Sequence, residues 1–194
     1  MAFIKRKKIR PKIKLTEKIV QDILAQYKSH LKRYDVIIPC CMSQIDNEAD
    51  IFAIRKSGFS DEFEIKLSRA DFFKDRNKIV QYRKNDITSG NDKKWFISNS
   101  KLRNPIAPWQ KLKLDAISDG DMLVNYFWYV VKKGIVEISE IPKFSGIISI
   151  DDTGFLEVIR NPEKLHNRKL SFEERFKFAS LLNERFWKYR SNQK

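Results

Sequence analysis

Apolar residues recur at helical spacing in three parts of the chain and at strand spacing between them. The helical spacing predicts an amphipathic helix over residues 16–31, capped by Thr16, and a second over residues 69–83, capped by Ser68. A third helix is expected over residues 171–189. The apolar stripe expected to face the core from this last helix consists of Phe172, Phe176, Ala179, Leu182 and Phe186.

Short apolar runs bounded by turn-forming residues predict the strands. They cover residues 34–41, the two arms of a hairpin that turns at Gly58, and residues 94–97, 125–131, 146–150 and 155–159. Residues 98–122 read as a polar loop in which basic side chains surround Trp109, a mixture that allows phosphate contacts and base stacking, or simple anchoring of the loop. Those basic residues are Lys101, Arg103, Lys111 and Lys113. Helices alternating with strands predict a mixed α/β fold.

The hairpin around Gly58 carries the candidate chemistry. Successive side chains of a strand point to opposite faces, so Glu64 and Lys66 share one face while Phe63 and Ile65 take the other. Asp50, on the preceding strand, is expected opposite or diagonal to them, so that two carboxylates and an amine meet at one point. A structural alternative is a cross-strand salt bridge without chemistry.

Such a site suits metal-assisted cleavage of a phosphodiester. Mg²⁺ prefers one or two carboxylates together with substrate phosphate and water. Asp50 and Glu64 are therefore candidate metal ligands, and Glu48, two residues before Asp50, is either a further ligand or exposed to solvent. Lys66 is expected to orient the attacking water or to help deprotonate it, since a desolvated lysine near a metal can titrate at lower pH.

The charge of the chain points to a polyanionic partner. Its 39 Lys and Arg against 25 Asp and Glu give a net charge of +14, which favours nucleic acid, with an anionic membrane or a ribosomal location as the alternative. Residues 2–14 hold seven basic residues and no acid, which predicts a basic tail over residues 1–14. We find no run of 18 apolar residues and no secretory signal, so we expect a cytoplasmic protein that does not enter a membrane.

The chain length sets the number of domains. With 194 residues, of which 42% are hydrophobic, we expect one ordinary core and a single domain over residues 15–194. The adjacent Cys40 and Cys41 suit neither a structural disulfide nor a zinc site, and they are expected to end a buried strand.

Asp50, Glu64, Lys66 and the segment from Glu64 through Asp75 together resemble the PD-(D/E)XK phosphodiesterase superfamily, in particular a small bacterial and phage branch associated with DNA repair and processing. The resemblance covers residues 15–100 and, more loosely, 125–170. One departure is Ala49, where the family has proline. The resemblance implies a restriction-endonuclease-like core of a helix, a three-strand meander, a second helix and a further strand. The strand hairpin and the C-terminal helix would be additions to this core.

The resemblance also implies a function. It predicts a Mg²⁺- or Mn²⁺-dependent deoxyribonuclease acting in DNA repair, recombination or phage DNA processing, with Asp50, Glu64 and Lys66 as its active site. In some branches of the superfamily a glutamate of the first helix adds to the metal site, and Glu17 is the candidate here. Related nucleases often have a polar residue at the place of Gln81, which would orient the lysine or the phosphate. Two alternatives stay open. One is a junction-resolving nuclease working as a homodimer, and the other is a DNA-binding module that has lost turnover.

Overall fold

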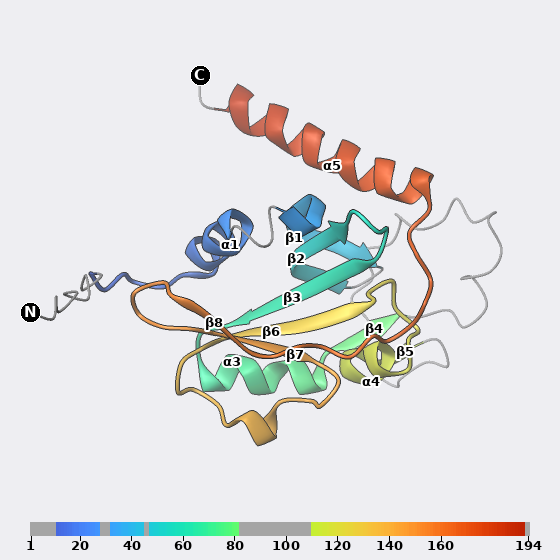
Figure 1. The fold of residues 1–194 in the computed structure, drawn as a ribbon. Coiled ribbons are helices and arrows are strands. Elements are labelled where there is room, and N and C mark those ends of the chain that lie inside the picture. The colour runs from blue at the N-terminus through green and yellow to red at the C-terminus, as the bar shows by residue number, and fades with distance from the viewer. Residues whose placement is uncertain (1–10, 28–31, 45–46, 82–109, 193–194) are drawn as a thin grey trace, which may run out of the picture.

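The computed structural model describes residues 11–27, 32–44, 47–81 and 110–192, and a six-stranded mixed sheet organises them (Figure 1). The strand order across this sheet is β1-β2-β3-β6-β7-β8. The bounds are β1 Tyr34–Gln44, β2 Asn47–Arg55, β3 Ser60–Lys66, β6 Tyr126–Lys132, β7 Gly146–Ile150 and β8 Leu156–Arg160. The mixed α/β fold predicted from the sequence is confirmed.

Strand direction follows from the connections. β1, β2 and β3 form an antiparallel meander, and the turn between β2 and β3 contains Gly58 at φ +86°, a conformation that glycine adopts without strain. β6 lies parallel to β3, β7 lies parallel to β6, and β8 returns antiparallel to β7. In the β2–β3 register Ile51 lies opposite Phe63, so Asp50 sits where β2 reaches the end of its ladder with β3.

Helices cover both faces of the sheet (Figure 1). They are α1 Glu17–Gln26, α3 Arg69–Lys74, α4 Lys113–Ser118 and α5 Phe172–Ser191, with short 3₁₀ turns η1 Asp75–Asn77 and η2 Ile138–Glu140. A second sheet pairs β4 Ile79–Gln81 with β5 Gln110–Leu112. Thr16 and Ser68 cap their helices as predicted, and Ser171 caps α5, each side chain accepting a backbone N–H bond.

Apolar side chains form a core on each side of the sheet. Val20 and Leu24 of α1 pack on Phe63 and Ile65 of β3 and on Trp128 of β6. The opposite face buries a second cluster, which includes Phe72, Val80, Ile117, Phe127 and Tyr129. Phe63 and Ile65 thus take the face that the sequence predicted for them. Gly146 lies against the first cluster, where an added Cβ would be 2.3 Å from Cε3 of Trp128.

A buried amide joins three segments at one end of β3 and β6. The Oδ1 atom of Asn125 accepts the backbone N–H of Ser60 at 2.8 Å, while Nδ2 donates to the carbonyls of His166 and Arg168 at 3.0 and 2.7 Å. Nδ2 also contacts Nδ1 of His166 at 3.0 Å, and Nε2 of His166 lies 2.8 Å from the carbonyl of Met122. A neutral imidazole satisfies both contacts, and burial lowers the pKa of His166 from 6.5.

Four sequence predictions differ from the structure. The helix expected over residues 69–83 ends at Lys74 and gives way to η1 and β4. The part of the expected loop 98–122 that is described contains β5 and α4. The first helix ends at Gln26. The strand expected over residues 94–97 lies outside the described residues, as do Lys101, Arg103 and Trp109.

The fourth difference concerns α5. Of the stripe expected to face the core, Phe172, Phe176 and Phe186 are exposed. The side chains that pack against the β1–β2 face are Phe178, Leu181 and Leu182, because only that side of the helix meets the cluster around Phe52. None of the described helices is both long and apolar enough to cross a bilayer.

Candidate active site

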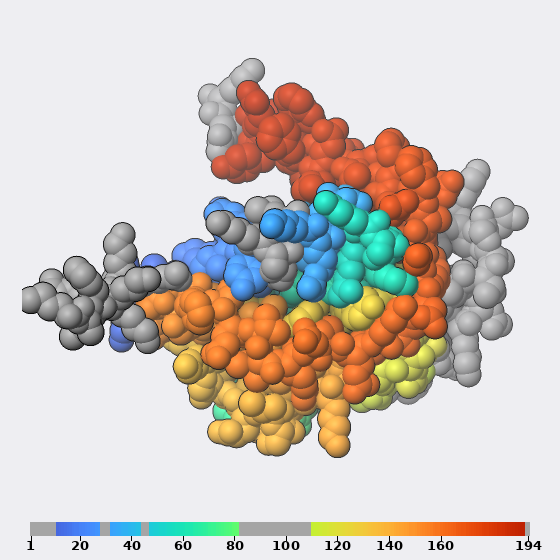
Figure 2. Space-filling view, viewed as in Figure 1, coloured from blue at the N-terminus to red at the C-terminus, as the bar shows by residue number. Residues whose placement is uncertain are grey.

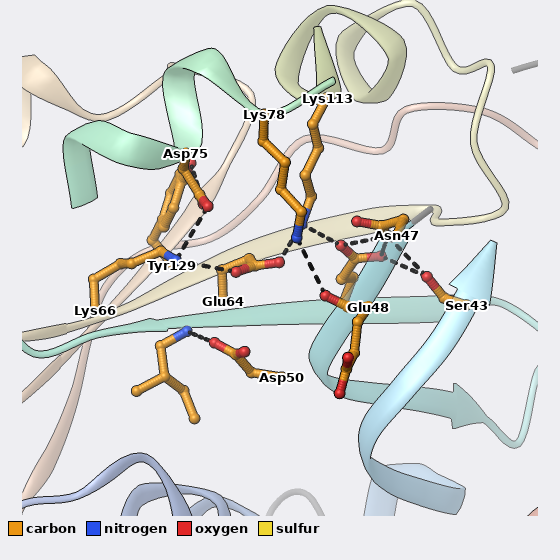
Figure 3. Close-up of polar contacts among 12 residues, drawn as sticks. Ser43, Asn47, Glu48, Asp50, Glu64, Lys66, Asp75, Lys78, Lys113 and Tyr129 are labelled. Carbon is orange, nitrogen blue, oxygen red and sulfur yellow. Dashed lines mark hydrogen bonds and ion pairs between the residues drawn. The ribbon is translucent and has the colours of Figure 1, made fainter. Parts of the chain in front are cut away.

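The C-terminal part of β3 places charged side chains in the interior. Every residue of β3 is buried, including Glu62, Glu64 and Lys66. Glu64 and Lys66 are only 2% and 6% exposed, and both extend toward α3 and α4 (Figure 3). Buried charges are stable only when they are paired and hydrogen-bonded, so the partners of these groups define the site.

Lys66 is paired with acids on two elements. Its Nζ lies 3.2 Å from Oε2 of Glu64 and 3.1 Å from Oδ1 of Asp75, with half-exposed Asp71 at 4.0 Å. The other oxygen of Asp75 accepts the hydroxyl of Tyr129 at 3.3 Å. Burial alone would lower the pKa of Lys66, but the facing carboxylates outweigh it and raise the pKa. In the protein without metal Lys66 is therefore a cation, whereas the expectation that it titrates at lower pH concerns the metal-bound site and stays a prediction.

Lys113, the first residue of α4, completes the pairing of Glu64. Its side chain is fully buried, and its Nζ contacts Oε1 of Glu64 and lies 2.9 Å from Oε1 of Glu62 (Figure 3). Burial disfavours the ammonium form, yet the charges of Glu62 and Glu64 more than compensate and raise the pKa of Lys113. The pKa of Glu64 is correspondingly lowered: burial opposes ionisation, but the charges of Lys113 and Lys66 prevail.

Glu62 is held by neutral groups as well. Its Oε2 accepts the hydroxyl of Ser43 at 3.2 Å and the amide of Asn47 at 3.0 Å, and the same amide donates to Ser43 at 2.9 Å. These contacts connect the ends of β1 and β2 to the middle of β3. The carboxylate of Glu62 is therefore held by Ser43 and Asn47 on one side and by Lys113 on the other.

Asp50 lies at the edge of this cluster. Its Oδ2 accepts the backbone N–H of Ile65, the residue between Glu64 and Lys66, at 2.6 Å (Figure 3). Burial and then the charge of Glu64 raise the pKa of Asp50 to about 7. The structure thus brings Asp50 beside the Glu64–Lys66 pair as predicted, although its direct contact is with the backbone between them.

The backbone of β1 is distorted opposite Asp50. Cys40 has φ +46°, a left-handed conformation that side-chain-bearing residues rarely adopt and that costs about 1–3 kcal/mol. The amide of Gln21 in α1 spans this point: its Nε2 lies 3.0 Å from the carbonyl of Asp50, 3.4 Å from Sγ of Cys40 and 3.0 Å from Oε1 of Glu17. Glu17 is thereby tied to the site through Gln21, and its charge adds to the forces that raise the pKa of Asp50.

The remaining two candidates lie further away. Glu48 is exposed, and its backbone carbonyl lies 3.4 Å from Nζ of Lys78. Gln81 lies in β4 opposite Gln110, and among the described residues no contact joins it to Asp50, Glu64 or Lys66.

Sequence reasoning did not assign Lys113 or Asp75 to the site. Lys111 and Lys113 belong to the basic mixture around Trp109 that the sequence reading allowed to contact phosphate, and the structure gives both of them carboxylate partners. Lys111 lies 2.6 Å from both Asp119 and Asp121, while Lys113 is buried on β3. Asp75 was expected within a continuous helix, and no local signal marks it as a partner of Lys66.

Asp50 and Glu64 are the two carboxylates that the sequence analysis offered as metal ligands. Among the described residues no group of three or more His, Cys, Asp or Glu side chains is arranged to hold a metal. Mg²⁺, however, needs only one or two carboxylates from the protein. The raised pKa of Asp50, caused by burial and by Glu64, is the condition that a cation between the two groups would relieve.

Comparison with known proteins adds information on the fold. No protein-family model matches the chain, and no curated protein matches it. A solved structure of a protein of unknown function from Silicibacter pomeroyi is similar, with a TM-score of 0.57 and 15% sequence identity over 93% of this chain and 96% of that one. At this identity the likeness shows a shared α/β fold and nothing about activity.

Proposed function

We propose that the protein is a metal-dependent deoxyribonuclease that hydrolyses phosphodiester bonds. The observation that carries this proposal is the assembly of Asp50, Glu64 and Lys66 at neighbouring ends of β2 and β3, with Glu64 and Lys66 3.2 Å apart and Asp50 bonded to the residue between them. Two carboxylates beside a lysine match the chemistry of metal-assisted phosphoryl transfer, in which charge stabilisation does most of the work.

The order of elements supports the same assignment. α1, the β1–β2–β3 meander and α3 follow one another along the chain, and the parallel strand β6 comes later, after η1, β4, β5 and α4. With these intervening elements set aside, the order matches that of the core that the PD-(D/E)XK resemblance implies. In that core the resemblance would make Asp50, Glu64 and Lys66 the active site.

Each residue then has a distinct role. Asp50 and Glu64 would hold Mg²⁺ or Mn²⁺, and the metal would supply charge neutralisation and a more acidic bound water. Lys66, held as a cation by Glu64 and Asp75, would orient the phosphate and the attacking water rather than remove a proton. Glu17 acts on Asp50 through Gln21, whereas Glu48 and Gln81 have no contact in the described structure that supports a role.

The charge of the chain favours DNA as substrate. A net charge of +14 attracts a polyphosphate through the release of condensed counterions. We place this activity on cytoplasmic DNA, in repair, recombination or phage DNA processing.

A second candidate is a DNA-binding module without turnover. The observation in its favour is that both oxygens of Glu64 are already engaged by Lys66 and Lys113, so the site is neutralised by its own lysines. A carboxylate has further lone pairs, so Glu64 could still bind a metal. The pairing of both its oxygens with lysines also suits a purely structural cluster.

Cleavage assays separate the two candidates. The full chain is incubated with single-stranded, nicked, branched and duplex DNA in the presence of Mg²⁺ or Mn²⁺. We expect cutting, and we expect Lys66→Ala to lower its rate by about 10²–10⁴-fold, while Lys132→Ala, at a partly exposed lysine of β6, leaves it unchanged.

Folding is checked by circular dichroism, because Lys66 is buried. Should Lys66→Ala fail to fold, Asp50→Asn is nearly isosteric at a half-buried position and gives the same test. Absence of cutting of every DNA form by the unmodified chain with both metals would refute the nuclease and leave the binding module.

A further inference from the structure

The C-terminal half of α5 presents aromatic and basic side chains that the fold does not use. Phe186, Trp187 and Tyr189 are 51%, 58% and 61% exposed, although aromatic rings of this size are normally buried. Lys188 and Arg190 are exposed between and beside them. We call residues 185–190 the α5 tip.

The tip extends beyond the body of the protein. α5 packs on the sheet through Phe178, Leu181 and Leu182, in its middle. Beyond this contact the helix continues, and Figure 2 shows its C-terminal part standing clear of the blue residues of α1 and β1. The rings of the tip therefore have free space around them in the described structure.

Arg185 anchors the tip next to the candidate active site. Its guanidinium donates to the carbonyls of Pro39 and Cys40 at 2.6 and 2.9 Å. Cys40 in turn contacts Gln21, which holds the backbone of Asp50. The tip thus starts three contacts away from Asp50, a proposed metal ligand, and leads outward from it.

We propose that the α5 tip binds single-stranded DNA, by stacking bases on its aromatic rings and pairing phosphates with Lys188 and Arg190. Exposed rings interleaved with cations are the combination that holds single strands without sequence preference. The guanidinium of Arg190 lies 5.7 Å from the Trp187 ring, which places a cation at the edge of a stacking platform. The choice of DNA as the ligand rests on the proposed function, whereas the exposure of the aromatic and basic side chains is independent of it.

Other occupants fit this surface less well. A second copy of the chain also carries a charge of +14, and residues 185–190 contain no acid, so two tips would repel each other. A bilayer favours a helix whose apolar residues share one face. Trp187 and Tyr189 instead project to nearly opposite sides of the tip, because residues two apart on a helix are rotated by about 200°, and the cations lie between the rings.

The test measures binding of a fluorescein-labelled oligo(dT) strand to the full chain by anisotropy, in EDTA so that no cleavage occurs. We expect Trp187→Ala and Tyr189→Ala each to weaken binding by about 5- to 100-fold. The matched control is Phe176→Ala: this ring is 62% exposed on the same helix, near the acidic first turn, and its loss is expected to leave affinity unchanged.

A charge variant gives an independent readout. Changing Lys188 and Arg190 to Gln is expected to reduce the slope of log K against log salt by about 0.7 per lost phosphate contact. Unchanged affinity in both aromatic variants would overturn the proposal. So would a change of oligomeric state by light scattering in Trp187→Ala, since the surface would then join copies, or binding to neutral lipid vesicles in place of the strand.

Failure of this inference is distinguishable from failure of the nuclease. Strand binding by the tip is measured without metal and does not depend on Lys66. A chain that binds through the tip but cuts nothing keeps the inference and loses the nuclease, and a chain that cuts DNA but binds the strand equally well with a mutated tip does the reverse.

Discussion

Removal of Lys113 is the most direct test of the buried cluster. The cluster contains three carboxylates, of Glu62, Glu64 and Asp75, and two ammonium groups, of Lys66 and Lys113. Lys113→Met keeps most of the length and volume of the side chain but leaves Glu62 and one oxygen of Glu64 facing an uncharged group. Removing one partner of a buried ion pair costs about 3–5 kcal/mol, because the remaining charge is neither solvated nor compensated.

The predicted loss is large enough to measure by melting. For a chain of this size each kcal/mol lowers the melting temperature by about 2–4 °C, so we expect a fall of about 6–20 °C. The control is Lys132→Met: Lys132 is partly exposed and paired with Asp152 at the surface, and the expected loss is under about 1 kcal/mol. Adding Glu62→Gln to Lys113→Met is expected to restore part of the lost stability.

The pH dependence of the variant identifies the cause. Burial raises the pKa of Glu64 and the charge of Lys113 opposes it, so without Lys113 the pKa of folded Glu64 rises. The destabilisation is therefore present at neutral pH and shrinks as Glu64 becomes protonated at lower pH. Urea unfolding followed by circular dichroism at about pH 7 and about pH 5 measures this change. A loss below about 1 kcal/mol at neutral pH, or a loss that does not shrink at low pH, would refute the reasoning.

Three further predictions test other parts of the fold. The lowered pKa of His166 means that the folded state favours its neutral form. Its contribution to stability is therefore complete above pH 6.5 and is lost as the pH falls below that value. His166→Gln should remove this part of the pH dependence in urea titrations. Gly146→Ala should destabilise the protein by about 1–3 kcal/mol or more by calorimetry, because its methyl group would lie 2.3 Å from the Trp128 ring; a melting temperature equal to that of the unmodified chain would contradict this contact. Cys40 is exposed and Cys41 is buried with its pKa raised to about 12, so a thiol reagent should modify Cys40 in the native protein and Cys41 only after unfolding; equal reaction rates would show the burial to be wrong.

Local sequence signals were sufficient for the β2–β3 hairpin and its charged residues. The turn at Gly58 and the alternation of side chains fix the register, and the register brings Asp50 to Glu64 and Lys66. Lys113 could not be found in this way. It is 49 residues from Glu64 in sequence, and only the packing of α4 on the sheet distinguishes it from the neighbouring Lys111.

The errors in helices have a similar origin. The spacing of apolar residues located α5, but apolar residues occur all around this helix, so the pattern could not show that Phe178 faces the core and Phe176 does not. In α3 the apolar spacing continues past Lys74. There Asp75 turns inward to Lys66 and Tyr129, and this tertiary pairing coincides with the end of the helix.

The β4–β5 ladder sets Gln81 directly across from Gln110. The chain thus leaves β4 and enters β5 at facing residues, so one rung of this ladder fixes both ends of the connection between them. Doubling the length of a flexible connection costs only about 0.6 kcal/mol in closure entropy. We therefore expect insertions between Gln81 and Gln110 to be tolerated while the buried carboxylates and lysines keep their arrangement.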